Sequence, residues 1–246
     1  MAVKFSYYGA MTVLIERSDG YKILCDPYLN NDCNSTHSVS DFYDVDLVLI
    51  THTAFDHFGD VIEICENSNC IVCGGVETRR RINAQYKLPN DRWHATIYGD
   101  IFKVDEKTTV RTVFAQHNSF DNTEGVNTNW LPFGFVVEVE PGVCYYHTGD
   151  TFLYSDMKMI REFYKPNVMC VGVSAISPEY PCELGAREAA TAVLWCGVDA
   201  VIPTHYPKGS PDLDKFLEYL PYIAPKAKAM PAVGKTFTYH PSWVEE

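Results

Sequence analysis

The sequence predicts an α/β protein, and three observations lead to this class. Patterns typical of strands alternate with patterns typical of helices along the chain. The 246 residues are 46% hydrophobic, which is enough to bury a sizeable core in one large domain or two small ones. Several predicted strands also end in an aspartate or a histidine. Sites of α/β proteins form at such strand ends, where loops converge over a rigid sheet.

The first part of the chain consists mainly of predicted strands. Apolar or alternating runs between turn signals predict strands at residues 3–9, 11–16, 21–29, 45–52, 70–75, 93–99, 101–106 and 108–117. The centre of the run at 45–52 is continuously apolar, so we expect that strand to be buried on both faces. Helical patterns at residues 60–67 and 77–87 lie between some of these strands. We therefore expect a sheet covered by helices.

The second part of the chain repeats this alternation. Two long strands are predicted at 133–140 and 143–150, joined by the turn Pro141-Gly142. Further strands are predicted at residues 167–174, 198–206 and 235–240, and helices at residues 154–164, 186–197 and 212–220.

Composition and charge exclude several classes of function. The formal net charge of −12 repels phosphate backbones, so we expect no nucleic-acid partner. The one dense basic cluster, at residues 79–81, fits the solvated face of a helix. No apolar run approaches the roughly 20 residues that span a bilayer, and the first residues lack a signal-peptide pattern. With nine irregularly spaced cysteines, these features predict a cytoplasmic protein with no membrane partner.

Six side chains at or beside strand ends form a candidate set of metal ligands. They are His52, Asp56, His57, His117, Asp150 and His205. Imidazole suits zinc, iron and nickel, and carboxylate widens the choice toward harder ions such as manganese. A single histidine is more often structural, and Asp56 alone also fits a helix N-cap. The repetition of the pattern at several strand ends is what predicts a divalent metal site.

The segment THTAFDHFGD, residues 51–60, resembles the His-x-His-x-Asp-His signature of the metallo-β-lactamase-fold hydrolases. AQHNSF, YYHTGDT and VIPTHYP resemble the later motifs of that family, in order. ELGAREAATAVLWCGVDAVIPTHY resembles the closing region of its ascorbate-6-phosphate lactonase-like branch. The resemblance covers nearly the whole chain. It implies one domain over residues 1–246, an αββα sandwich of two mixed β-sheets packed face to face with helices on both outer faces.

The resemblance also implies two metal sites. The second site is complete, and its ligands are Asp56, His57, His205 and the bridging Asp150. The first site keeps His52, His117 and Asp150. Ala54, however, stands where the family has the third imidazole of the first site. We therefore expect one tightly bound divalent metal, with zinc before manganese, iron or nickel, and a second metal that binds more weakly if it binds at all.

Three interpretations of Ala54 remain open. One metal in the second site is sufficient, or another side chain fills the gap, or catalysis has been lost. The candidates for filling the gap are His37, His94 and His147. His147 lies on a strand shortly before Asp150, so it also fits a role in packing against or orienting that carboxylate.

The expected chemistry is hydrolysis by metal-activated water. A bound metal lowers the pKa of water and stabilises the negative charge that develops on oxygen. Asp56 and Asp150 are expected to orient water and metal, and His117 or His52, if only loosely coordinated, to donate a hydrogen bond to the oxyanion. Asp26, in the turn CDPYL, either fixes a ligand imidazole or belongs to a turn without a role in the site.

The substrate is expected to be a small molecule. Polar loops at residues 31–44, 117–130 and 177–186 are expected to wall the pocket and suit a small polar ligand. The aromatic candidates for its lining are Phe120, Trp130, Tyr180 and Tyr206. The branch implies a lactone or another ester. The alternatives are a phosphodiesterase and a non-catalytic metal-binding or ligand-sensing protein, and self-association into a homo-oligomer is left open.

Overall fold

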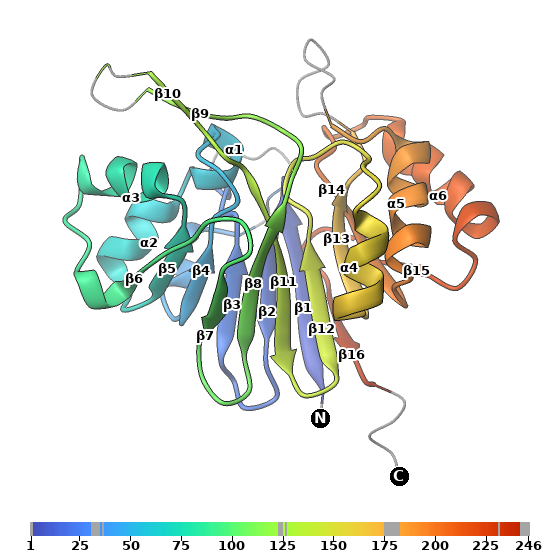
Figure 1. The fold of residues 1–246 in the computed structure, drawn as a ribbon, viewed down its shortest axis with the longest axis horizontal. Coiled ribbons are helices and arrows are strands. Elements are labelled where there is room, and N and C mark those ends of the chain that lie inside the picture. Colours follow the sequence, from blue (N-terminus) through green and yellow to red (C-terminus); the bar gives the residue numbers. More distant parts are fainter. Residues whose placement is uncertain are drawn as a thin grey trace.

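The computed structural model describes residues 2–30, 35, 37–122, 125, 127–174, 183–230 and 232–241. Across these residues the strands form two seven-stranded sheets and one two-stranded hairpin. Figure 1 shows the two large sheets in the centre, with helices on the outer side of each. The predicted sandwich of two mixed sheets between helices is therefore confirmed.

The first sheet contains the N-terminal strands and one strand from the last part of the chain. Its order is β16-β1-β2-β3-β4-β5-β6. The pairs from β16 to β3 are antiparallel, and those from β3 to β6 are parallel. The strands are β1 Val3–Gly9, β2 Thr12–Glu16, β3 Lys22–Cys25, β4 Leu47–Leu49, β5 Ile71–Gly74, β6 Trp93–Ala95 and β16 Thr236–Tyr239.

The second sheet has the order β15-β14-β13-β12-β11-β8-β7. The pairs from β7 to β12 are antiparallel, and those from β12 to β15 are parallel. The strands are β7 Ile101–Lys103, β8 Thr109–Phe114, β11 Phe133–Glu140, β12 Val143–His147, β13 Val168–Gly172, β14 Ala200–Thr204 and β15 Lys228–Ala229.

Helices cover the outer face of each sheet, with α2 and α3 on the first and α4, α5 and α6 on the second (Figure 1). The α-helices are α1 Phe55–Phe58, α2 Val61–Asn67, α3 Val76–Asn83, α4 Met157–Tyr164, α5 Ala186–Cys196 and α6 Asp212–Ile223. The 3-10 helices are η1 Val39–Phe42 and η2 Asn90–Arg92. None of the helices in the described ranges is long and apolar enough to cross a membrane.

Two apolar clusters hold these layers together. The larger lies between the sheets and extends to α4–α6, and it includes Phe5 and Tyr145 from facing strands. The rings of these two residues are 5.5 Å apart. The smaller lies between the first sheet and its helices, where Val48 and Ile64 are buried. β4 is buried at every position, which confirms the expectation of a strand covered on both faces.

Several short elements were not predicted, among them both 3-10 helices. α1 is a single helical turn inside the histidine-rich loop, and β15 has only two residues. A hairpin of β9 Ser119–Asp121 and β10 Thr128–Trp130 lies within the predicted polar loop. Such elements are too short for a periodic pattern to reveal them. Much of the two other predicted wall loops, and Tyr180 with them, lies outside the described residues.

Candidate metal centre

The six predicted ligands come from both halves of the sandwich. Three belong to the first half: His52 follows β4, and Asp56 and His57 lie in α1. Three belong to the second half: His117 follows β8, Asp150 follows β12 and His205 follows β14. Because β12, β13 and β14 are parallel, the residues that follow their carboxyl ends share one edge of the sheet. Figure 1 shows α1 at the same end of the molecule as the β9–β10 hairpin.

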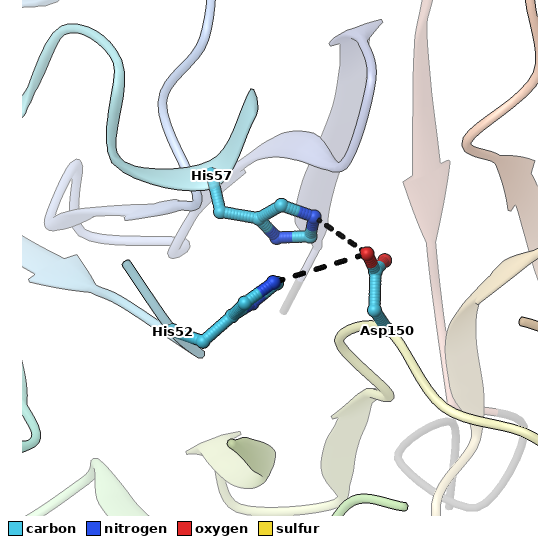
Figure 2. A group of neighbouring side chains, drawn as sticks. All are labelled: His52, His57 and Asp150. Carbon is cyan, nitrogen blue, oxygen red and sulfur yellow. Dashed lines mark ion pairs between the residues drawn. The ribbon is translucent and has the colours of Figure 1, made fainter. Parts of the chain in front are cut away.

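The structure brings these side chains together around Asp150. Figure 2 shows His52 and His57 directed toward one oxygen of this carboxylate. The His57 Nε2 atom lies 3.1 Å from Asp150 Oδ2, and the His52 Nε2 atom lies 3.9 Å from it. The His117 Nε2 atom lies 3.8 Å from the same oxygen. The His205 Nε2 atom lies 3.4 Å from Oδ1.

Asp56 joins the cluster through His205. Its Oδ2 atom lies 3.2 Å from His205 Nε2. Two groups therefore form, one of His52, His57 and Asp150 and the other of Asp56, His57 and His205. In each group the potential ligand atoms lie within 4.8 Å of one another. The second group is the second site inferred from the family motif, without its bridging aspartate.

Buried polar atoms at the centre of the cluster show that its residues fit a metal ion. His52 Nε2, His57 Nε2 and Asp150 Oδ1 are buried and have no hydrogen-bond partner among the described residues. The contact between His57 Nε2 and Asp150 Oδ2 is short, but its geometry is not that of a hydrogen bond. Buried polar atoms are almost always satisfied in folded proteins. Nitrogen and oxygen atoms that converge without satisfying one another are the donor set that a divalent cation requires.

Hydrogen bonds behind two imidazoles fix which nitrogen faces the cluster. His57 Nδ1 lies 2.8 Å from Asp26 Oδ2, and the His205 Nδ1–H donates to the carbonyl oxygen of Ser174 at 2.9 Å. Both contacts leave Nε2 directed toward the centre. A metal-ligating histidine needs such a partner to hold its ring and its tautomer. Of the two interpretations of Asp26, the structure therefore supports the one in which it fixes a ligand imidazole.

Asp26 is itself held in a fully buried network. Its carboxylate accepts hydrogen bonds from the Thr51 backbone N–H at 2.8 Å and from the Thr51 hydroxyl at 2.7 Å. His147 Nε2 lies 3.0 Å from Asp26 Oδ2, and the other ring nitrogen of His147 lies 2.8 Å from the Tyr145 hydroxyl. The network joins the ends of β3, β4 and β12, so it links the two sheets behind the metal ligands.

Opposite charges in the cluster shift the pKa values of its groups. Burial acts to lower the pKa of His205, but the Asp150 and Asp56 carboxylates outweigh it and raise this pKa to about 9. Against the same effect of burial, the carboxylates of Asp150, Asp26 and Asp56 raise the pKa of His57. Burial acts to raise the pKa values of both carboxyl groups, but the neighbouring histidines lower them. Without a metal, protons on His57 and His205 therefore balance the carboxylate charges.

In the first site, by contrast, the pKa values of both histidines are lowered. Burial, together with the positive charge of His57, lowers the pKa of His52 to about 3. Burial also lowers the pKa of His117. Both imidazoles are therefore neutral near pH 7, which is the protonation state that a metal ligand needs.

These shifts predict that the metal-free protein is most stable near pH 6.5. A histidine whose pKa is raised from 6.5 to about 9, as for His205 and His147, contributes stability below pH 6.5 that is lost as the pH rises through 9. His52 and His117, whose pKa values are lowered, cost stability as the pH falls below 6.5. We expect the melting temperature of chelated protein to be lower at pH 5 and at pH 9 than at pH 6.5.

A metal-loaded sample is the control for this pH profile. Metal binding competes with protons on the same nitrogens, so the stabilisation by added metal should increase from pH 6.5 to pH 9. A chelated protein that melts at a higher temperature at pH 9 than at pH 6.5 would contradict the assignment of the raised pKa values.

None of the three histidines considered for the place opposite Ala54 lies in the cluster. His147 is held by Asp26, behind the ligands. His94 Nε2 lies 2.6 Å from Asp100 Oδ2. His37 packs against the rings of Tyr8 and Phe42. None of His37, His94 and His147 therefore supplies the missing ligand of the first site.

A glutamate that sequence reasoning did not single out lies beside the first site. Potential ligand atoms of His117, Asp150 and Glu183 lie within 4.8 Å of one another. In the sequence Glu183 belongs to a loop interpreted only as a pocket wall. The signal that the sequence offers for Glu183 is an acidic residue shortly before the helix that begins at Ala186.

The basic cluster at residues 79–81 lies on the helix α3, as predicted, but its side chains are half-buried and not fully solvated. The Arg81 guanidinium donates a hydrogen bond to the backbone carbonyl of Thr53 and lies 4.3 Å from the centre of the Phe58 ring. Thr53 stands between His52 and Ala54. Arg81 therefore stabilises the loop that carries His52. The sequence pattern could not show this contact, because it joins α3 to a loop distant in the sequence.

A pocket of about 540 Å³ adjoins the cluster at His117. Besides His117, the residues around it include Tyr98, Phe114, Asn118, Asn129 and Trp130. Of the other aromatic candidates, Phe120 is 58% exposed, and Tyr206 is buried and packs near Tyr7. The pocket wall thus combines aromatic rings with side-chain amides, which makes it less polar than the loop composition suggested.

The fold and the cluster define a metallohydrolase-like protein, and comparison with known proteins shows its family. The family model described as the β-lactamase superfamily domain matches residues 21–206. The chain belongs to this family, within the metallo-β-lactamase superfamily.

Its relatives and structural neighbours agree with this assignment. A UPF0173 metal-dependent hydrolase of Methanosphaera stadtmanae is 33% identical over 211 residues, covering 83% of this chain and 84% of the relative. One of Pyrococcus furiosus is 32% identical over 228 residues, covering 93% and 95%. Igni18, a metallo hydrolase of Ignicoccus hospitalis, has a TM-score of 0.81 at 24% identity, covering 98% and 99%. The chain is thus a metal-dependent hydrolase of this superfamily.

Proposed function

We propose that the six clustered side chains bind divalent metal and that the chain hydrolyses a small carboxylic ester, with a lactone as the first candidate. The observation that carries the metal assignment is the set of buried, unsatisfied atoms on His52, His57 and Asp150. The names of the relatives support a metal-dependent hydrolase but specify no substrate. The choice of an ester rests on the pocket beside His117.

Each side chain of the proposed centre has a distinct task. A bound divalent metal would lower the pKa of water and stabilise negative charge on a substrate oxygen. His57 and His205 would present Nε2 to the metal, because Asp26 and the Ser174 carbonyl hold their other nitrogens. The lowered pKa values keep Asp56 and Asp150 ionised, so they would hold the metal and accept hydrogen bonds from water.

His117 connects the cluster to the pocket. Its Nε2 faces Asp150 Oδ2, and the residue also lines the pocket. A substrate held in the pocket would thus place its reacting carbonyl beside His117. This placement supports a role of His117 in orienting the carbonyl or in stabilising the charge that develops on its oxygen.

The pocket wall favours an ester over a phosphodiester. No lysine or arginine is among the described residues that line it. A phosphodiester carries a charge before and during reaction, and sites for it normally supply cationic side chains. The net charge of −12 adds long-range repulsion of anions. Aromatic and amide side chains instead suit a neutral substrate with an apolar portion.

A substrate panel tests this proposal. Metal-free protein would be reloaded separately with zinc, manganese, iron and nickel, then assayed with lactones, aryl esters and aryl phosphodiesters. We expect hydrolysis of the neutral esters or lactones, loss of activity on chelation, and recovery with metal. Faster turnover of the phosphodiesters would overturn the proposed substrate class. A protein that binds no metal would overturn the proposed centre.

Trp130→Ala is expected to weaken binding of an ester with an apolar portion. Loss of an aromatic contact of about 1.4 kcal/mol would raise KM about tenfold while kcat changes little. Tyr222→Ala is a matched control, because Tyr222 is 89% exposed and lies on α6. Equal KM values for the wild type and Trp130→Ala would exclude this pocket as the binding site for the apolar portion.

A further inference from the structure

We propose that Glu183 replaces the imidazole that Ala54 cannot supply and completes the first metal site with His117 and Asp150. This inference rests on the proposed metal centre and specifies its ligands. It differs from the family-derived assignment, in which no residue of the 183–186 segment is a ligand.

The geometry places the Glu183 carboxylate within reach of this site. Its oxygen and the ligand atoms of His117 and Asp150 all lie within 4.8 Å of one another. Glu183 is half-buried, between β13 and α5 in the second half of the sandwich. The helix cap of α5 does not depend on it, because the Gly185 N–H donates to Glu188 Oε2 at 3.1 Å.

The first site contains a second, independent indication of a cation. The His52 side chain is 1% exposed, and its Nε2 has no hydrogen-bond partner among the described residues. This atom and His117 Nε2 face the same oxygen of Asp150, at 3.9 and 3.8 Å. Two imidazoles and one carboxylate supply three ligands, so a further protein donor would complete a four-ligand set.

Ala54 cannot provide this donor. Its methyl side chain has no lone pair, and its carbonyl oxygen accepts hydrogen bonds from the N–H groups of His57 and Phe58 at the start of α1. Glu183 approaches from the opposite half of the molecule. The substitution at position 54 is therefore compensated by a carboxylate from a distant loop rather than by another histidine.

A carboxylate in place of an imidazole changes the chemistry of the first site. The ligands become two nitrogens, from His52 and His117, and two carboxylates, from Asp150 and Glu183. Carboxylates favour harder ions, so this set should bind manganese or iron better, relative to zinc, than a site with three imidazoles. Ala54→His should shift the first site back toward zinc.

Metal titration of Glu183→Gln tests the proposal without an activity assay. Metal-free wild type and variant would be titrated with zinc and with manganese by calorimetry, and bound metal counted by plasma mass spectrometry after dialysis. We expect two bound metals in the wild type. In Glu183→Gln we expect one tight metal and a second whose affinity is lowered by more than about tenfold. The control is Glu106→Gln, an exposed position between β7 and β8.

Two more variants show whether a lost metal in Glu183→Gln results from the missing ligand or from misfolding. Glu183→His, and Ala54→His combined with Glu183→Gln, should each restore the weaker metal because an imidazole replaces the lost ligand. Unchanged binding of the second metal by Glu183→Gln would overturn this inference, as would a wild type that binds only one metal under both titrations. Both outcomes leave the proposed hydrolase intact, since only a wild type without any metal removes its basis.

Discussion

His205→Asn is expected to abolish binding of the tight metal and to lower kcat/KM for ester hydrolysis by at least about a hundredfold. His205 Nε2 faces both Asp56 and Asp150, so its loss removes the imidazole shared by the carboxylates of the second site. Replacement of a residue that merely supports a metal ligand already costs about 10–100-fold in affinity or activity. Metal content by plasma mass spectrometry and steady-state kinetics measure the two effects.

Asparagine is the suitable replacement because of the backbone at this position. His205 has a φ of 58°, in the left-handed region that asparagine tolerates better than alanine. The matched control is His94→Asn, which removes a histidine paired with Asp100 outside the cluster. Wild-type metal content in His205→Asn would refute the assignment of the second site.

Asp26→Asn should destabilise the metal-free protein by about 3–5 kcal/mol, since it leaves buried, charged partners uncompensated. Asp26 is fully buried between His57 and His147, at 2.8 and 3.0 Å. Its carboxylate is the nearest balancing charge for both rings. Asparagine again suits the backbone, because Asp26 has a φ of 44°. The free energy of unfolding from urea titration measures the loss.

An exposed ion pair provides the comparison for Asp26. Glu16 pairs with Lys4 at the surface, where their side chains are 31% and 52% exposed. Such pairs contribute about 1 kcal/mol or less, so Glu16→Gln should change stability little. If Asp26→Asn and Glu16→Gln had equal effects, the Asp26 network would have no special role in joining the sheets.

Local patterns in the sequence predicted most strands and helices but not their shortest neighbours. The continuous apolar run that contains β4 and the amphipathic run of α5, which has 11 residues, are both long enough to be recognised. α1 has four residues, and β9 and β10 have three each. Their formation depends on tertiary contacts, such as those of Thr53 with Ser119 and Phe120.

The candidate site could be predicted where its residues belong to an ordered motif, and not where they come from loops. His52 and His205 were found because the motif fixes their order along the chain. Glu183 and Arg81 reach the site from segments whose local sequence indicates only a loop and a helix. Which loop folds back over the sheet ends is determined by long-range packing, which the sequence pattern does not encode.

The division of the candidate ligands between the two sheets has a consequence for unfolding. Residues 52–57 come from one half of the sandwich, and His117, Asp150 and His205 from the other. A cation bound by both sets is a cross-link between halves that are otherwise joined by apolar contacts and by the Asp26 network. A free metal concentration a hundredfold above the Kd would add about 2.7 kcal/mol to the free energy of unfolding. Metal supply would then govern both turnover and the resistance of the two halves to separation by heat or proteases.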